Sequence, residues 1–522
     1  MLQSTAPKGV FSGNKVGLEK ESLRVAPSGS LAQTPHPVAL GSALTHPFIT
    51  TDYSEALLEF VTPAFNEKQD VLDFLTECQT FVYQQLQDEI LWSTSMPCVL
   101  AGETSIPIAK YGTSNLGQMK TVYRRGLGHR YGRVMQVIAG VHYNYSFSPA
   151  FWELFKDLEK SSLSLQHFIS ENYFNIIRNV QRVGWLIPYL FGASPAVCKS
   201  FLHGQTTDMP SFNENTYYYP YATSLRMGDI GYQNNIENAS GIRINYDNLS
   251  SYIKSLAYAI STPYDPYKKI GIKTEKGYEQ LSANLLQIEN EYYSSIRPKQ
   301  IGPADEMPIN GLKRRGVAYI ELRSLDINAY EPTGISCNAL YFLETLMLYC
   351  LLQPSPPISV EEHKNISRNL VEVAHRGRQP GLMLQSHDSE QSLLEWARKI
   401  FKDLSHIAEF LDANSGCENF SRALQLYRIR IENPDDTPSA RMLAEMKANG
   451  EGFFHFALRK SEEHSRYFNS LTLSPERWNY FQSLSTQSLE KQKLLETSNK
   501  IGFDNFLENY FSQNLKAFSE TN

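Results

Sequence analysis

Hydrophobic and polar residues alternate in short segments over roughly the first 335 residues of the chain, and hydrophobic residues recur every three or four positions in most of the remainder. Alternation with a period of two is typical of β-strands with one buried face, whereas the longer period is typical of amphipathic helices. Because the strand-like segments do not alternate regularly with helices, we predict an α+β fold rather than repeated βαβ units. We expect strands at residues 16–25, 57–62, 136–146, 242–246, 285–293 and 317–325.

Helical spacing predicts two helical regions within the first part of the chain, at residues 67–91 and 151–190. In the second part it predicts four helices, at 337–352, 359–376, 390–412 and 438–448, and the run Gln353-Pro-Ser-Pro-Pro357 separates the first two. The polar stretch from Ser474 onward is expected to be helical or partly frayed. We therefore divide the chain into a sheet-rich core with inserted helices, residues 1–335, and a helical part, residues 336–522, that packs on the same unit.

The composition and charge of the chain indicate what kind of molecule it binds. The chain has 522 residues, 42% of them hydrophobic, which is enough for a large core, and its formal net charge is -6. Since it has no long basic run, we expect small-molecule partners and no binding to nucleic acid. The 6 cysteines are scattered without a C-x-x-C pair, so we expect free thiols in a reducing cytosol.

The hydrophobic segments are too short for export or membrane insertion. The first 15 residues lack the uninterrupted apolar stretch of a signal peptide. The most apolar window, residues 339–352, is interrupted by Glu344 and is shorter than the ~20 residues of a membrane-spanning helix. We therefore expect a cytoplasmic protein and interpret this window as a buried helix.

Acidic residues fall on one face of several predicted strands. Side chains two positions apart on a strand share a face, so Glu19 and Glu21 project together, roughly 6.6 Å apart along the strand. In the segment YIELRSLDIN, Glu321 and Arg323 share a face with Tyr319, while the hydrophobic residues between them face the other way. Two further segments repeat this pattern, with polar faces formed by Gln287, Glu289, Glu291 and Tyr293, and by Gln136, His142, Asn144 and Ser146.

Such a face could simply be exposed to water, as one side of an antiparallel sheet often is. Four polar faces together, three of them acidic, favour a different interpretation, because clustered glutamates repel one another unless cations lie between them. Carboxylates with one imidazole form an oxygen-rich ligand set that suits Mg²⁺ or Mn²⁺. A lone His142 would more often be structural, but its position on such a strand makes it a candidate ligand.

A second acidic group lies in the segment HPFITTDYSEALLEFVTP. Asp52, Glu55 and Glu59 fit one helical face, and Asp52 with Glu55 could be a helix-capping pair, which explains Glu55 best. Glu59, however, lies in a short alternating run that ends at a proline, where strand geometry places it opposite Leu58 and Phe60. Asp52 and Glu59 are therefore candidate metal ligands.

Common nucleotide-binding and hydrolytic motifs are absent from the sequence. It has no G-x-x-x-x-G-K-[ST] loop and no G-x-G-x-x-G motif opening a βαβ unit. It also has no G-x-S-x-G turn and no H-E-x-x-H helix. Any ATP would therefore have to be held largely through metal ions.

Several long segments of the first part of the chain are distinctive: GLEKESLR, THPFITTDYSEALLEFVTP, YGTSNLGQMKTVYRRGL, GVHYNYS, YYYPYATSLRMGDIGY, LLQIENEYYSSIRPK and YIELRSLDIN. In these segments, from about Gly17 to Asn328, the sequence resembles the proteobacterial type of the glutamate-cysteine ligase family. Beyond that range the resemblance thins, with HRGRQPGL and NPDDTPSARML as later islands. The resemblance implies a fold related to glutamine synthetase, in which a curved antiparallel sheet forms a funnel surrounded by helices.

The resemblance also implies the roles of individual residues. The metal ligands would be Glu19, Glu21, Asp52, Glu59, His142 and Glu321. Arg226 would bind the substrate glutamate, and the pocket for the accepting cysteine would be formed by Tyr123, Tyr232, Leu127, Gln136 and Tyr293. Arg323 would steady the transferred phosphoryl group beside Glu321, whereas Glu289 and Glu291 would have structural roles or contribute general charge.

The implied activity is the ATP- and Mg²⁺-dependent joining of L-glutamate to L-cysteine through a γ-glutamyl phosphate, by a monomer. Three alternatives remain open at this point. A ligase of the same fold could use another amine acceptor, because pocket side chains set that choice. A two-metal phosphohydrolase would use the same ligand types to activate water, although compact D-x-H or H-D motifs are missing around the candidate ligands. A non-enzymatic protein could use the acidic face to bind divalent ions or a partner.

Overall fold

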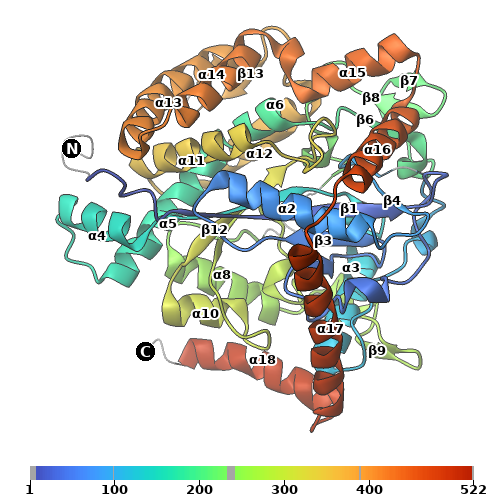
Figure 1. Ribbon diagram of the computed structural model, residues 1–522. Coiled ribbons are helices and arrows are strands. Elements are labelled where there is room, and N and C mark those ends of the chain that lie inside the picture. The colour runs from blue at the N-terminus through green and yellow to red at the C-terminus, as the bar shows by residue number, and fades with distance from the viewer. Residues whose placement is uncertain (1–6, 98, 232–241, 387–388, 520–522) are drawn as a thin grey trace.

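A seven-stranded antiparallel sheet forms the centre of the protein (Figure 1). The structure is a computed structural model that describes residues 7–97, 99–231, 242–386 and 389–519. The strand order is β11-β12-β5-β1-β3-β2, and β4 pairs with the end of β1. The strands are β1 (Lys15–Val25), β2 (Ile49–Thr51), β3 (Leu57–Val61), β4 (Ile90–Leu91), β5 (Val141–Ser146), β11 (Ile296–Lys299) and β12 (Tyr319–Leu325).

The two faces of this sheet have different surroundings. Val16 and Leu18 of β1 are fully buried on one face, and Lys20 on the same face donates a 2.5 Å hydrogen bond to Gln79 of α2. Three helices pack against this face or the strand ends, namely α2 (Lys68–Tyr83), α5 (Leu165–Val183) and α6 (Leu186–Phe191), and α11 (Cys337–Leu352) packs on α2 and α5. The opposite face, which carries Glu19 and Glu21, is left for a cavity.

A second group of helices lines that cavity or packs against its wall. It consists of α3 (Asn115–Tyr131), α8 (Leu249–Ser261), α10 (Pro308–Arg315) and α18 (Phe503–Ser519). In Figure 1, α17 runs from the level of the sheet down to α18, which lies below α10. The last helix of the chain therefore lies beside elements that belong to its first part.

The remaining helices and strands are peripheral. They are α4 (Pro149–Leu158), α9 (Asp265–Lys268), α12 (Val360–Arg376), α13 (Leu393–Ser415), α14 (Asn419–Glu432), α15 (Pro438–Asn449), α16 (Phe453–Ser470), α17 (Pro475–Thr497), the three-stranded sheet β6 (Ala196–Cys198), β8 (Thr216–Tyr218) and β7 (Ser211–Asn213), and the hairpins β9 (Lys273–Thr274) with β10 (Gly277–Tyr278) and β13 (Met383–Gln385) with β14 (Glu390–Ser392). Several helices begin at a hydroxyl N-cap, among them Ser336 before α11, Ser359 before α12 and Thr437 before α15.

The mixed α+β class is confirmed, and the strands predicted at 16–25, 57–62 and 317–325 are found within two residues of their expected bounds. The helix at 337–352 is also confirmed, as are those at 359–376 and 438–448 to within one residue. The helix predicted at residues 67–91 ends earlier, at Tyr83. The helical region predicted at residues 151–190 is divided into three helices, α4, α5 and α6. The predicted helix at 390–412 begins only at Leu393, after β14.

Two predicted strands are wrong. Residues 242–246 form no strand, because Arg178 hydrogen-bonds the carbonyls of Tyr246 and Asp247 and the Asn245 side chain accepts from the backbone of Asp247. Residues 285–293 contain instead a 3-10 turn, Glu289–Glu291. The strand follows it as β11, which the sequence analysis missed because it contains Pro298, a residue that an edge strand tolerates.

The strand predicted at 136–146 is confirmed only from Val141, since Met135–Val137 forms a 3-10 turn.

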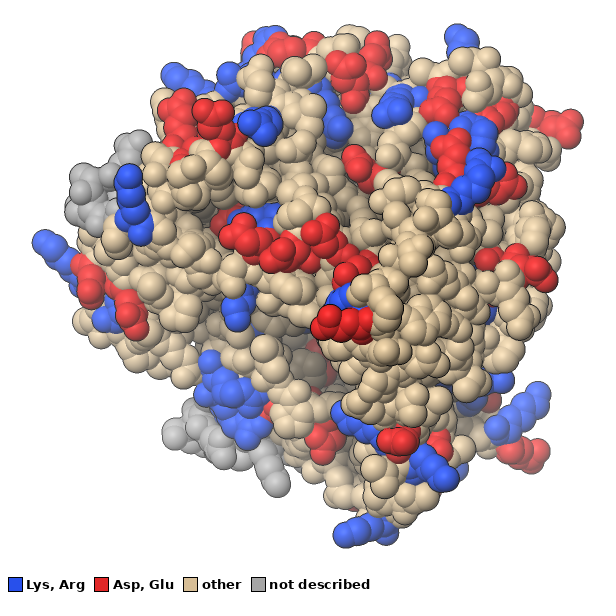
Figure 2. All heavy atoms as spheres, in the orientation of Figure 1, with Lys and Arg blue, Asp and Glu red and all other residues tan. Residues whose placement is uncertain are grey.

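Of the cysteines, Cys78, Cys337, Cys350 and Cys417 are free, whereas Cys198 is disulfide-bonded, so the expectation of free thiols is wrong at that position. Among the described residues, no helix has the length and apolar character needed to cross a membrane. On the face shown in Figure 2, acidic side chains gather in a band over α2, and elsewhere basic and acidic residues are mixed.

Candidate active site

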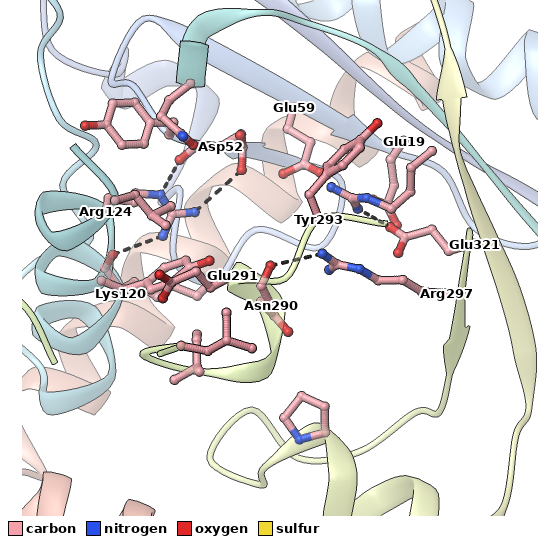
Figure 3. A pocket seen from close by; sticks show the side chains of 18 of the residues that line it. Glu19, Asp52, Glu59, Lys120, Arg124, Asn290, Glu291, Tyr293, Arg297 and Glu321 are labelled. Carbon is pink, nitrogen blue, oxygen red and sulfur yellow. Dashed lines mark hydrogen bonds and ion pairs between the residues drawn. The ribbon is translucent and has the colours of Figure 1, made fainter. Parts of the chain in front are cut away.

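A cavity of about 390 Å³ lies over the charged face of the sheet. Its floor is formed by residues of β1, β3, β5 and β12, and its walls by α3, the segment 286–293, β11 and the segment 304–308. Figure 3 shows Glu19 and Glu321 together at one end, Asp52 with Arg124 at the other, and Glu59 between them. The cavity therefore joins residues from Glu19 to Tyr510, almost the full length of the chain.

Strand register brings the predicted ligands together. Glu19 pairs directly with His142, and Glu21 pairs with Glu59. Directly opposed residues of antiparallel strands have their Cβ atoms about 4.5–5.5 Å apart. Alternation along β1 thus places three carboxylates and one imidazole on a single patch of the sheet.

The imidazole of His142 lies at the centre of this patch. Its Nδ1 is 3.1 Å from a carboxylate oxygen of Glu19 and 3.5 Å from one of Glu321, and its Nε2 is 3.9 Å from Glu21. Asn144, two residues along β5, donates a 3.0 Å hydrogen bond to the second oxygen of Glu19. One ligand atom from each of Glu19, His142 and Glu321 lies within 4.8 Å of the others, a spacing at which one ion could contact all three.

The electrostatics of the carboxylates show that their negative charge is only partly balanced. Burial and the nearby Asp52 raise the pKa of Glu21 to about 8, even though the amide of Gly140 donates a 2.6 Å hydrogen bond to it. Burial and the Glu19 carboxylate raise the pKa of Glu59 well above its usual range. A bound cation would favour the ionised form of both groups.

Glu321 differs from the other carboxylates because cations surround it. Arg323 donates a 2.8 Å hydrogen bond to one of its oxygens, and the ammonium group of Lys299 is 3.3 Å from the other. Although burial opposes ionisation, Arg323 and Lys299 hold the pKa of Glu321 well below its ordinary value. Arg323, Lys299 and Arg297 therefore place positive charge beside the acidic patch.

Helix α3 forms one wall of the cavity. Ser114 caps its first turn by accepting a 3.2 Å hydrogen bond from Gly117. Seven of its residues line the cavity and recur at helical spacing along one face: Leu116, Met119, Lys120, Tyr123, Arg124, Leu127 and Tyr131. The guanidinium of Arg124 lies 4.0 Å from the carboxylate of Asp52 and packs on the ring of Tyr111 at 4.6 Å.

The six predicted metal ligands all line the cavity, as do four of the six predicted substrate-binding residues, Tyr123, Leu127, Gln136 and Tyr293. Arg226 is not among the lining residues: its side chain is 1% exposed and it donates a 2.8 Å hydrogen bond to the carbonyl of Arg323. Tyr232 lies outside the described residues. The turn predicted as a possible helix around Asp52 is a connection between β2 and β3, where Glu55 accepts hydrogen bonds from the backbone of His36 and Lys110.

Several residues of the cavity were not predicted from the sequence. Lys120 and Arg124 could have been found from their spacing with Tyr123 and Leu127, which is that of one helical face. Arg297 and Lys299 alternate on β11, with Arg297 directly opposite Glu321, but the proline between them hid the strand. Nothing in the sequence indicated that Tyr510, near the end of the chain, would line the cavity.

Comparison with known proteins agrees with this architecture. A sequence model described as glutamate-cysteine ligase matches residues 1–373. The chain is 45% identical over 506 residues to the glutamate-cysteine ligase of Alcanivorax borkumensis, covering 96% of both proteins. It is 46% identical over 494 residues to that of Pseudomonas putida, covering 95% of this chain and 94% of the relative.

Solved structures show the same fold. The glutamate-cysteine ligase of Francisella tularensis in complex with AMP superimposes with a TM-score of 0.89 and 35% identity, covering 97% of this chain and 98% of that one. A bifunctional glutathione synthetase from Pasteurella multocida, at 22% identity, has a TM-score of 0.72 over 93% of this chain and 57% of its own, which shows the fold alone.

The α+β fold, the carboxylate-rich cavity and these relatives place the protein among the ligases. The chain belongs to the glutamate-cysteine ligase family. Its activity is that of a glutamate-cysteine ligase, which carries out the first step of glutathione biosynthesis.

Proposed function

We propose that the cavity binds ATP, a divalent cation, L-glutamate and L-cysteine, and that ligation proceeds through a γ-glutamyl phosphate. A free carboxylate does not acylate an amine in water, so the γ-carboxylate oxygen of glutamate first attacks the γ-phosphorus of ATP and ADP leaves. The cysteine nitrogen then attacks the acyl carbon, phosphate leaves and the nitrogen loses a proton. No covalent bond to the protein is required.

The donor set of the cavity fits a hard divalent cation, Mg²⁺ with Mn²⁺ as an alternative. The residues that would hold it are Glu19, Glu21, Asp52, Glu59, His142 and Glu321. The raised pKa of Glu21, caused by burial and the Asp52 charge, is what uncompensated clustering of carboxylates produces. Such ions, when bound, would neutralise phosphate charge and so allow a nucleotide to approach acidic walls.

The cations of the site would act on the transferred phosphoryl group. Arg323 is held by Glu321 through a 2.8 Å hydrogen bond, so its guanidinium is oriented before the substrate arrives. Lys299, on the neighbouring strand, adds a second positive charge on the other side of Glu321. We assign to Arg323 the stabilisation of charge on the phosphoryl group and to Glu321 the joint role of metal ligand and anchor of Arg323.

The substrate-binding residues are assigned by the family resemblance, and the place of Tyr123, Leu127, Gln136 and Tyr293 in the cavity supports the assignment of these four. We infer that Arg226 supplies positive charge for the substrate glutamate. The cysteine would lie among Tyr123, Leu127, Gln136 and Tyr293, which line the cavity, together with Tyr232. We further propose that the sheet is the wall of a funnel related to that of glutamine synthetase, that residues 336–522 complete the same catalytic unit, and that the chain acts as a monomer in the cytoplasm.

The observation that carries the proposal is the convergence of Glu19, His142 and Glu321, with Arg323, on one wall of the cavity. The test is a coupled assay of ADP release in which glutamate, cysteine and Mg²⁺ are omitted in turn. Steady-state ADP release should require all three. Sustained release without glutamate and without an amine would instead indicate a phosphohydrolase. Comparing cysteine with 2-aminobutyrate and other amines would then define the acceptor.

A further inference from the structure

Asp326 is a buried carboxylate that lies one residue beyond the end of β12 and is used by none of the roles above. Its side chain is fully enclosed, and it accepts three hydrogen bonds. One oxygen accepts from the amide of Ala193 at 2.8 Å and from the hydroxyl of Ser194 at 2.6 Å, and the other accepts from the hydroxyl of Ser224 at 2.9 Å. The carboxylate therefore ties the end of β12 to two other segments of the chain.

The guanidinium of Arg226 lies between this carboxylate and the strand that carries Arg323. Its Nη1 is 3.8 Å from Asp326, and its Nη2 donates a 2.8 Å hydrogen bond to the carbonyl of Arg323. Gly140 provides the space, because a Cβ atom at this position would lie 2.2 Å from Nη2. The amide of Gly140 also donates to Glu21, so Arg226 lies directly behind a predicted metal ligand.

The turn that carries Arg226 is held independently from its other side. The carbonyl of Ala374, near the end of α12, accepts hydrogen bonds of 2.9 and 3.2 Å from the amides of Thr223 and Ser224. Arg378, just beyond α12, donates to the carbonyls of Ala222 and Pro220 at 3.2 and 2.7 Å. Loss of the Asp326 charge would therefore leave the backbone of this turn anchored and would change mainly the direction and charge balance of Arg226.

We propose that Asp326 is a positioning residue for glutamate binding. Ser194, Ser224 and the amide of Ala193 orient its carboxylate, which in turn holds the guanidinium of Arg226 beside the carbonyl of Arg323 at the Glu21 end of the cavity. A buried guanidinium is held in one orientation when a fixed carboxylate and a fixed carbonyl oxygen both contact it, as the Asp326 carboxylate and the Arg323 carbonyl contact Arg226. This inference rests on the proposed role of Arg226 in binding glutamate.

The test is the substitution Asp326→Asn, which keeps the shape of the side chain and removes its charge. KM for glutamate should rise roughly 10- to 100-fold, by analogy with the loss caused by removing the hydrogen-bond partner of a metal-ligating side chain. KM for ATP should change less than about twofold. The matched control is Asp412→Asn, since Asp412 is also buried and accepts two 2.9 Å backbone hydrogen bonds, from Phe420 and Ser421, but lies in α13. That variant should lose thermal stability without any change in KM for glutamate.

A double-mutant cycle with Arg226→Gln separates positioning from a purely structural role. If Asp326 acts through Arg226, adding Asp326→Asn to Arg226→Gln should cause little further rise in KM for glutamate. Additive effects, or equal rises in KM for glutamate and ATP, would overturn the inference. If Arg226→Gln leaves KM for glutamate unchanged, the proposed role of Arg226 itself fails. If Arg226→Gln raises it but Asp326→Asn does not, only the positioning role fails.

Discussion

Glu321 combines three interactions in one side chain. It faces His142 at 3.5 Å, Arg323 at 2.8 Å and Lys299 at 3.3 Å, and only 1% of its side chain is exposed. Its length and position are therefore dictated by the charges around it rather than by packing volume. An amide of the same shape would keep the volume but lose the charge.

We expect Glu321→Gln to lower the rate of ADP-forming ligation by at least about 100-fold, the loss typical of removing one preorganised electrostatic contact in an active site. The fold should persist, because the substitution keeps the side-chain volume. The coupled ADP assay and thermal melting with and without Mg²⁺ check both points. Mg²⁺ should raise the melting temperature of the wild type more than that of the variant. Ligation at the wild-type rate would remove Glu321 from the catalytic set.

His46 is a buried histidine outside the cavity that predicts a dependence of stability on pH. Its Nδ1 accepts hydrogen bonds from the amides of Phe48 and Ile49, at 3.1 and 2.8 Å, which requires an unprotonated nitrogen. Burial lowers its pKa to about 4. The folded protein thus keeps His46 neutral at a pH where the unfolded chain already binds a proton.

Above about pH 6.5 the residue is neutral in both states and contributes no pH dependence. Between about pH 6.5 and 4 only the unfolded state gains a proton, so stability should fall with falling pH, by up to about 1.4 kcal/mol per pH unit for this one group. His46→Asn, whose side-chain oxygen can accept the same hydrogen bonds, should lose less stability than the wild type between pH 7 and 5. Denaturation midpoints measured at both pH values would show the difference, and equal losses would contradict it.

At the scale of whole elements, a buried polar network joins the helices behind the sheet. Glu344 of α11 forms an ion pair with Lys68 of α2, and it accepts hydrogen bonds from Asn14 at 2.8 Å and from Tyr145 of β5 at 3.2 Å. Burial would lower the pKa of Lys68, but the Glu344 carboxylate raises it above the ordinary lysine value. The one acidic residue in the most apolar window of the sequence therefore connects two helices to the sheet.

Glu344→Leu should destabilise the protein by about 3–5 kcal/mol, because it leaves Lys68 buried without its partner. Lys68→Met together with Glu344→Leu should recover most of this loss, since the aromatic rings of Tyr341 and Phe420 already flank the lysine. Urea denaturation of the two single variants and the double variant measures the coupling. A double variant as unstable as the sum of the single variants would show that the pair is not coupled.

At the scale of the whole molecule, the last helix completes the cavity. Tyr510 of α18 lines it, and Gln513 accepts a 3.2 Å hydrogen bond from the amide of Met307 and donates a 2.9 Å one to the carbonyl of Asp305. Asp504, at the other end of α18, pairs with Lys273 of the β9–β10 hairpin at 2.9 Å. Helix α18 thus spans the hairpin and the segment 304–308 that forms part of the cavity wall.

We expect Tyr510→Ala to raise KM for cysteine about 2- to 10-fold, the value of one aromatic contact, because Tyr510 neighbours Tyr123 of the proposed cysteine pocket. KM for ATP should change less, and removal of residues 503–522 should have a larger effect than the point substitution. Tyr467→Ala, at a position that is 42% exposed, serves as the control. Initial-rate kinetics of both variants measure KM for cysteine and KM for ATP. A selective rise in KM for ATP would show that Tyr510 is not part of the cysteine pocket.

The pattern of hydrophobic and polar residues was sufficient to predict features that depend on local interactions alone, such as which side chains share one face of a strand or helix. Alternation placed Glu19 and Glu21 on one face of a strand, and Glu321 with Arg323 on another, and helical spacing with the proline-rich break at residues 353–357 defined α11 and α12. It failed at residues 242–246, where Arg178 hydrogen-bonds the carbonyl of Tyr246. It also failed at residues 285–293, where the amides of Leu285 and Leu286 donate to the carbonyls of Thr262 and Ala259 instead of to a neighbouring strand.

Only the tertiary structure decided which of these faces meet. The pairing of Glu21 with Glu59, the placement of Lys299 beside Glu321 and the entry of Tyr510 into the cavity depend on strand register and on packing between segments far apart in the chain. Local propensity carries no information about such contacts, because their energy comes from burial and charge that exist only once the segments are assembled. The sequence by itself thus determined which side chains project together along each element, and the assembled fold determined which of them share one cavity.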